Sequence, residues 1–154
     1  MVKRTNLAPK DVAPPVGPYA LGVKVTSGTL VFVSGCVALD KTGAIVGKGD
    51  VEAQTRQVME NMKAVLASAG ATFQDVVKIN NYVTDASQYP KIAPIRNQYL
   101  TAPYPASTLV EVKSLLYPEF LVEIEAIAVV NDRQPAKGRT AVRSARGKAG
   151  RRGR

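Results

Sequence analysis

The stretch LVEIEAIAVV, residues 121–130, is the feature that most constrains the fold of this chain. Its β-branched and apolar residues alternate with period two, which predicts a β-strand. One face is apolar throughout and consists of Val122, Ile124, Ala126, Ala128 and Val130. The other face places Glu123 and Glu125 among apolar neighbours. Same-face neighbours lie roughly 7 Å apart, so the two carboxylates repel each other unless water or a partner intervenes. This strand therefore needs a core on one side and a polar partner on the other.

The remaining elements follow from turn and capping signals. Strands are expected at 21–25 and 29–39, joined by a hairpin turn at 26–28. Asp50 is a good N-cap for a helix that Gly70 ends, with an apolar face of Val58, Met62, Val65, Leu66 and Ala69. A strand at 75–84, a helix at 87–100 with Pro94 in its first turn or at a kink, and strands at 108–112 and 121–130 complete the domain.

This order predicts an α+β fold, in which two helices pack on one face of a single sheet. Residues 1–18 hold four prolines and are expected to be extended. The face of the last strand that carries Glu123 and Glu125 stays uncovered by helices, yet it also carries Leu121, Ile127 and Val129. An oligomer whose sheets meet around an axis would cover that face.

The composition indicates the class of protein and excludes several kinds of active site. The 154 residues are 45% hydrophobic and 21% charged, as in an ordinary soluble domain. No apolar run reaches the roughly 18 residues of a membrane span, and the N-terminus lacks a signal-peptide core, so we expect a cytoplasmic protein without membrane contact. The chain has no histidine, which excludes Ser-His-Asp and Cys-His nucleophiles and histidine metal sites. Cys36 is the only cysteine, so an internal disulfide is excluded.

The positive charge is concentrated in a tail. Residues 132–154 hold nine lysines and arginines against one aspartate, whereas residues 1–131 hold twelve against eleven acidic residues. We therefore expect a folded domain at 1–131 and a basic, disordered tail at 132–154. The tail either contacts nucleic acid through non-specific phosphate attraction or remains a solvated segment without a partner.

Several stretches together resemble one family. GPYALGV near the start, VFVSG at 31–35, QTRQVMENMKAVLASAGATFQDVVK at 54–78, TDASQYP at 84–90, PASTLVEV and LVEIEAIA resemble the RidA/YjgF family, also known as L-PSP endoribonuclease-like proteins. The resemblance covers residues 13–130. It implies a fold similar to chorismate mutase, with a mostly antiparallel sheet, and a homotrimer with ligand clefts between subunits. The best-known activity of this family is hydrolysis of reactive imines and enamines to a carbonyl compound and ammonia, without cofactor or metal.

The resemblance also assigns residues to the site. Glu123 matches the family glutamate that orients the attacking water, a general acid–base role. Tyr19 matches a cleft tyrosine, and Ser34 and Gly35 match the cleft wall, where glycine lets backbone amides approach a ligand. Ser107 and Thr108 are expected to contact the substrate. Glu125 is expected to be structural, paired with Lys113, and Cys36 to behave as a small hydrophobe.

One position departs from the family pattern. Imine-hydrolysing members carry an arginine after Pro-Ala that grips the substrate carboxylate, whereas this chain has Ser107 after Pro105 and Ala106. Losing a bidentate ion pair costs about 2–3 kcal/mol, or roughly 30- to 150-fold in affinity. A substrate with a smaller or uncharged head group is therefore expected. Arg96 is interpreted as a surface charge, with compensation for the missing arginine as the alternative.

Three functions remain open on these grounds. The first is a cofactor-free hydrolase of an imine, enamine or related small C=N metabolite, with Glu123 holding the water. The second is a trimeric binder of small metabolites that has lost the chemistry. The third is an endoribonuclease or translation inhibitor, which the missing histidine and the near-neutral body disfavour.

Overall fold

The structure, a computed structural model, describes residues 2–131. The predicted basic tail at 132–154 lies outside the described residues and stays a prediction. The strands are β1 (Arg4–Leu7), β2 (Gly22–Val25), β3 (Thr29–Cys36), β4 (Val76–Val83), β5 (Ala106–Glu111) and β6 (Val122–Val130), and the helices are α1 (Val51–Ser68) and α2 (Tyr89–Arg96). Short 3-10 turns precede β4 at Phe73–Asp75 and α2 at Ala86–Gln88.

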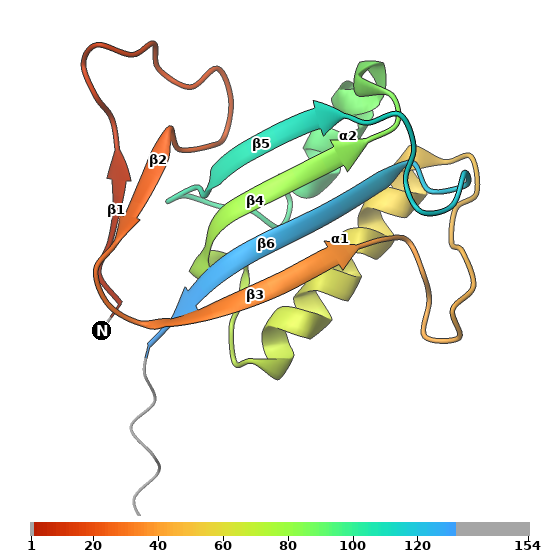
Figure 1. Ribbon diagram of the computed structural model, residues 1–154, viewed down its shortest axis with the longest axis horizontal. Coiled ribbons are helices and arrows are strands. Elements are labelled where there is room, and N and C mark those ends of the chain that lie inside the picture. Colours follow the sequence, from red (N-terminus) through yellow and green to blue (C-terminus); the bar gives the residue numbers. More distant parts are fainter. Residues whose placement is uncertain (1, 132–154) are drawn as a thin grey trace, which may run out of the picture.

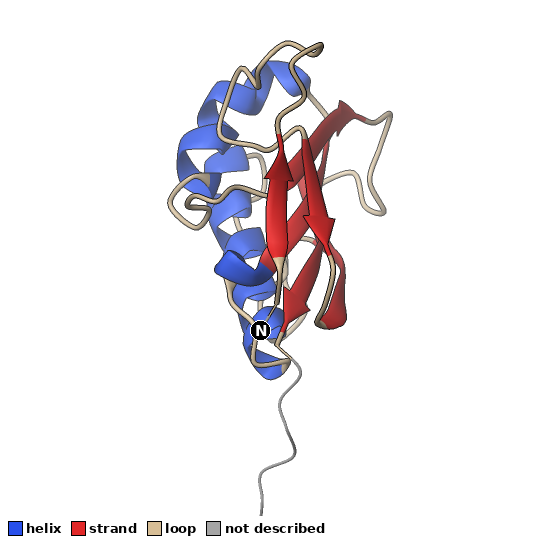
Figure 2. Ribbon diagram, turned by 90° about the vertical axis from the view of Figure 1, so that its left-hand side faces the viewer, coloured by secondary structure: helices blue, strands red, loops and turns tan. Residues whose placement is uncertain are grey.

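The main sheet has the strand order β3-β6-β4-β5, and only its β4–β5 pair is parallel (Figure 1). Both helices lie on one side of this sheet, as the turned view shows (Figure 2). The predicted α+β fold with two helices on one face is therefore confirmed. None of the helices in residues 2–131 has the length and apolar character needed to cross a bilayer.

The predicted hairpin between the first two strands is wrong. β2 pairs with β1 in a separate two-stranded sheet, and β3 pairs with β6 at the edge of the main sheet. Gly28 lies between β2 and β3 and allows the chain to pass from one sheet to the other, because its φ of 121° is a conformation that other residues rarely adopt. The N-terminal segment thus supplies β2 with a partner. Arg4 fixes β1 to the main sheet by donating hydrogen bonds to the carbonyls of Gln74, Val76 and Tyr104 over 2.7–3.1 Å.

Helix α1 begins where the sequence predicts. The Asp50 side chain accepts hydrogen bonds from the amides of Glu52 and Ala53, which are otherwise unpaired at a helix start. The buried face of α1 consists of Val51, Gln54, Thr55, Val58, Met59, Met62 and Leu66. Val65 was expected on this face but is 43% exposed, whereas Met59 and Met62 are fully buried.

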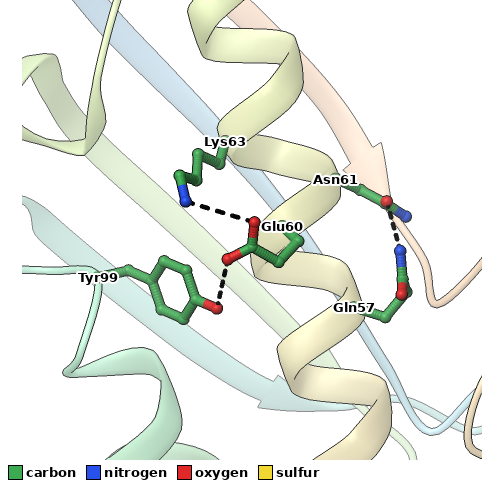
Figure 3. Close-up of polar contacts among 5 residues, drawn as sticks. All are labelled: Gln57, Glu60, Asn61, Lys63 and Tyr99. Atoms are coloured by element: carbon green, nitrogen blue, oxygen red, sulfur yellow. Dashed lines mark hydrogen bonds and ion pairs between the residues drawn. The ribbon is translucent and has the colours of Figure 1, made fainter.

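Polar side chains on α1 hold the neighbouring segments in place (Figure 3). Glu60 accepts a hydrogen bond of 2.8 Å from the Tyr99 hydroxyl and also pairs with Lys63. Gln57 donates to Asn61 at 2.8 Å, and Asn61 in turn donates to the carbonyl of Leu39 at 2.8 Å. These contacts tie both the segment after α2 and the segment after β3 to the same helix.

Helix α2 is shorter than the sequence predicts. It spans Tyr89–Arg96 rather than 87–100, and Pro90 rather than Pro94 occupies its first turn. Pro94 lies inside the helix and has no amide hydrogen to donate, which removes one bond of the last turn. Ile92, Ile95 and Arg96 form the buried face of α2.

Candidate functional site

The two faces of β6 behave as the alternation predicts. Val122, Ile124, Ala126 and Ala128 are buried in the core under the helices. Glu123, Glu125 and Ile127 alternate with them and lie on the face of the sheet that no helix covers. That face also exposes Phe32, which is paired with Ile127 and is 70% exposed. Within residues 2–131 this large apolar side chain is left exposed to solvent.

Glu125 has two hydrogen-bond donors on the adjacent strand β4. The Asn80 amide donates to its Oε1 at 2.7 Å and the Tyr82 hydroxyl donates at 2.9 Å. These bonds, with Asn80 as the larger cause, lower the pKa of Glu125. The expected structural role of Glu125 agrees with these contacts, but the expected pairing with Lys113 is wrong. Two neutral groups hold this carboxylate: Asn80, which lies directly opposite in the register, and Tyr82, which lies two residues further along β4.

Glu123 has no hydrogen-bond donor among residues 2–131, although it lies opposite Tyr82 in the register. Its carboxylate borders a hollow of about 340 Å³ whose lining residues are Tyr82, Val112, Ser114, Leu115, Leu116, Glu123 and Glu125. Gly35 lies directly against it, because a Cβ at this position would be 1.8 Å from Glu123 Oε1. The two neighbouring glutamates therefore differ: one is held by the sheet and the other is available to a ligand or water.

Ser34 and Gly35 lie where the pairing of β3 with β6 shifts register. This irregularity exposes both residues on the uncovered side, with Ser34 bordering a second hollow of about 310 Å³. Cys36 follows and is half-buried, and its thiol lies 3.6 Å from the carbonyl of Ser34. Burial and the charge of Glu123 raise the pKa of the Cys36 thiol, which disfavours the reactive thiolate.

Tyr19 and the β5 residues lie at the other edge of the sheet. The Ala20 amide donates to the carbonyl of Pro105 at 2.9 Å, which brings Tyr19 beside the start of β5. Tyr19 borders a hollow of about 260 Å³ formed mainly by the N-terminal segment. Thr108 is exposed and accepts a hydrogen bond from Lys78. Ser107 pairs with the buried Ile79 and so faces the helices rather than the uncovered side.

The predicted site residues thus form two groups within one chain. Glu123 aligns with Tyr82 on β4, whereas Ser107 aligns with Ile79, three residues away. This offset separates them by about 10 Å along the strands, and two strand spacings add about 10 Å across the sheet. The first group is Glu123 with Ser34 and Gly35; the second is Tyr19 with Ser107 and Thr108. One chain does not place both groups around one small ligand.

Arg96 was interpreted as a surface charge, and this interpretation is wrong. Its side chain is only 2% exposed and reaches beneath β5. The guanidinium donates to Asn81 Oδ1 at 3.1 Å and to Ser107 Oγ at 3.2 Å. The sequence did contain a signal for this burial, because position 96 follows Ile92 by four residues and therefore shares its helix face.

The chain resembles known proteins over almost all of the described domain. Residues 10–130 match the family model described as Endoribonuclease L-PSP. The chain is 35% identical over 124 residues to the 3-aminoacrylate deaminase RutC of Acinetobacter baylyi, covering 80% of this chain and 96% of the relative. It is 33% identical over 126 residues to a 2-iminobutanoate/2-iminopropanoate deaminase of Dermatophagoides farinae, covering 82% and 93%.

A solved structure shows the same fold. The Yersinia pestis protein YyfB, described as a protein of unknown function of the conserved Rid family, superposes with a TM-score of 0.75 at 37% identity. The match covers 82% of this chain and 98% of that structure. The chain therefore belongs to the L-PSP endoribonuclease family, which includes the RutC and RidA proteins.

Proposed function

We propose that this protein is a cofactor-free hydrolytic deaminase of small imines or enamines, with Glu123 holding the attacking water. The observation that carries this proposal is the free carboxylate of Glu123, which borders a hollow and has Gly35 directly beside it. Two relatives named as deaminases of a 3-aminoacrylate and of 2-imino acids support the same reaction class.

The chemistry needs one proton acceptor that later acts as a donor. Glu123 accepts a proton from water while the hydroxyl forms a bond to the C=N carbon, and the nitrogen takes a proton to give a carbinolamine. Collapse of this intermediate forms the carbonyl, breaks the C–N bond and releases ammonia. The net reaction consumes one imine and one water. An enamine first takes a proton on carbon to become the imine.

The proposal is tested by generating 2-iminopropionate in situ with an amino-acid-dehydrating enzyme and letting semicarbazide compete for it. The protein should suppress semicarbazone formation, and Glu123→Gln should lower the rate by about 100-fold or more. Glu125→Gln is the matched control, since it neutralises the neighbouring carboxylate on the same face and should retain most of the activity. Suppression that survives in Glu123→Gln would contradict the role of Glu123. A folded wild-type protein without any effect would contradict the proposed hydrolysis and favour a non-catalytic binder.

The assembly proposed with this function is a homotrimer whose clefts lie between subunits. Its support is the uncovered sheet face, where Phe32 is 70% and Leu30 is 54% exposed. Phe32→Glu should give a monomeric mass in solution while the fold is kept, because a charge would be buried in the contact. Val65→Glu is the control: Val65 is also exposed, but it lies on helix α1. A Phe32→Glu protein with the mass of the wild type would contradict this assembly.

A further inference from the structure

Gln54 is a fully buried residue near the start of helix α1, and its side-chain hydrogen bonds reach outside the helix. Its Nε2 donates to the carbonyl of Gly47 at 3.1 Å and to the carbonyl of Glu119 at 2.7 Å. Its Oε1 accepts from the Leu121 amide at 2.8 Å. Both donor hydrogens of the side chain are therefore in use. The amide group cannot be turned over, because its nitrogen would then face an N–H group and its oxygen two carbonyls.

Two of these three bonds hold the backbone on either side of Phe120. This residue is itself anchored, since its ring is buried against Tyr117 with 5.4 Å between the ring centroids. Its amide also donates to the carbonyl of Tyr117 at 3.1 Å. Gln54 therefore clamps the chain where it enters β6, from a helix on the other side of the sheet (Figure 2). Glu123 lies three residues after Phe120 and faces the uncovered side.

The segment between β5 and β6, residues 112–121, forms one wall of the hollow beside Glu123. The residues of this segment that line the hollow are Val112, Ser114, Leu115 and Leu116. At the first end of the segment, the Val112 amide donates to the carbonyl of Val83 at 2.8 Å. The second end is held by Gln54. Between these ends, the segment makes no hydrogen bond to another part of the described chain, so the position of the wall depends on how its ends are held.

We propose that Gln54 is a positioning residue for imine hydrolysis, which holds the wall formed by residues 112–121 at the distance from Glu123 that a small substrate requires. The inference rests on the proposed function and adds to it a residue from the helical layer. Glu123 itself should stay in place without Gln54, because β6 pairs with both β3 and β4. Loss of Gln54 should therefore weaken binding in the hollow and leave the chemical step nearly unchanged.

The test compares the affinity of the wild type and of Gln54→Met for pyruvate, the carbonyl product of 2-iminopropionate, by calorimetry on the folded proteins. Methionine is a flexible, unbranched side chain of similar length, but it removes all three hydrogen bonds. The Kd should rise by about 10-fold or more. In the semicarbazide competition the apparent KM should rise to a similar extent, whereas kcat should stay within about 3-fold of the wild type.

Thr55→Val is the matched control. Thr55 is the next residue of the helix and equally buried, but its hydroxyl donates to the carbonyl of Val51 at 2.7 Å, within the helix. This variant loses a buried hydrogen bond without releasing residues 112–121. It should lower the urea midpoint and keep the wild-type Kd and KM.

Gln54→Glu separates the hydrogen bonds from the packing. The introduced carboxyl would be buried and would face two carbonyl oxygens, which raises its pKa and favours the protonated form as the pH falls. When protonated, it can donate to one carbonyl and accept from the Leu121 amide, as glutamine does. Its Kd, divided by that of the wild type at the same pH, should therefore approach one between pH values of about 8 and about 5.5. The ratio for Gln54→Met should not. This variant also decides the question if Gln54→Met does not fold.

The outcomes separate the inference from the proposed function. A folded Gln54→Met protein with the Kd and KM of an active wild type would overturn the inference and leave the deaminase intact. So would a lower kcat with an unchanged KM, which reports only a smaller folded fraction. An inactive wild type whose affinity for pyruvate depends on Gln54 would contradict the deaminase and support the clamp on the hollow. A wild type that neither hydrolyses the imine nor binds pyruvate would overturn both.

Discussion

Gly35→Ala adds a single methyl group directly against the proposed catalytic carboxylate. The new Cβ would lie 1.8 Å from Glu123 Oε1, 2.7 Å from its Cδ and 3.0 Å from its Cγ. Since an ordinary carbon–oxygen contact is about 3.5 Å, the carboxylate must move by more than about 1 Å. The backbone of the strand should stay in place, because the clash involves one flexible side chain on the uncovered face.

The cost in stability should be small. Gly35 has no positive φ, so alanine fits its backbone. Alanine also lowers the conformational entropy of the unfolded chain, which should stabilise the folded protein by about 0.4–1 kcal/mol. A displaced Glu123 side chain in a poorer rotamer costs about 0.5–1.5 kcal/mol. These two terms nearly cancel, so the free energy of unfolding should change by less than about 1 kcal/mol.

The cost in activity should be large. A catalytic group displaced by about 1 Å loses on the order of 100-fold in rate. Imine hydrolysis in the semicarbazide competition should therefore fall by about 100-fold in Gly35→Ala. Combining it with Glu123→Gln should cause no further loss, because both changes remove the same group. Gly22→Ala, which adds a methyl group near Leu7 in the peripheral sheet, should keep the wild-type rate. Full activity in Gly35→Ala, or a loss that simply follows unfolding, would refute this reasoning.

Three further predictions concern stability. Arg4→Met removes the hydrogen bonds of the guanidinium to three backbone carbonyls and should lower the free energy of unfolding by about 2–3 kcal/mol, measured as a lower urea midpoint. Asp50→Ala removes the cap of α1 and should cost about 1 kcal/mol, whereas Asp50→Asn should cost less; equal midpoints for all three proteins would contradict the capping role. The hydroxyl of Thr42, followed by nearby backbone amides, holds the pKa of Asp40 below its usual value. The stabilisation from a depressed carboxyl pKa is present above the unfolded value of about 3.9 and is lost as pH falls through the folded pKa. Thermal unfolding of Asp40→Asn should therefore depend less on pH below about 4 than that of the wild type, and parallel curves would exclude this linkage.

The sequence predicts the parts of the fold that depend on local pattern. The strand at 121–130 alternates strictly, and its apolar face is buried as expected. Helix α1 starts at the residue after its Asp50 cap and ends two residues before Gly70. Such signals are local, so they remain readable without knowledge of the partner elements.

Pairings between distant segments were not predictable in the same way. β2 has strand character from its own sequence, but whether it pairs with β3 or with the N-terminal β1 depends on competition among distant segments. The partners of Glu125 also depend on register, because a shift of one residue would turn Asn80 and Tyr82 to the other face. Helical spacing indicated that Arg96 is buried. The prediction of a surface charge followed instead from the general rule that charged side chains are exposed in most proteins.

The separation of two residues that are expected to contact the substrate makes a further prediction. Glu123 and Ser107 are separated by about 14 Å in one chain, whereas a small imine carries its polar head group next to the C=N carbon. One substrate can contact both only if they come from different subunits of a ring-like assembly. Glu123→Gln and Ser107→Ala proteins should each be weakly active alone. Co-assembled in equal amounts, they should recover about a quarter of the wild-type rate per cleft, because a random cleft has that chance of receiving an intact residue from each neighbour. Mixtures that are no more active than the separate variants would show that both residues act within one chain or that only one of them contacts the substrate.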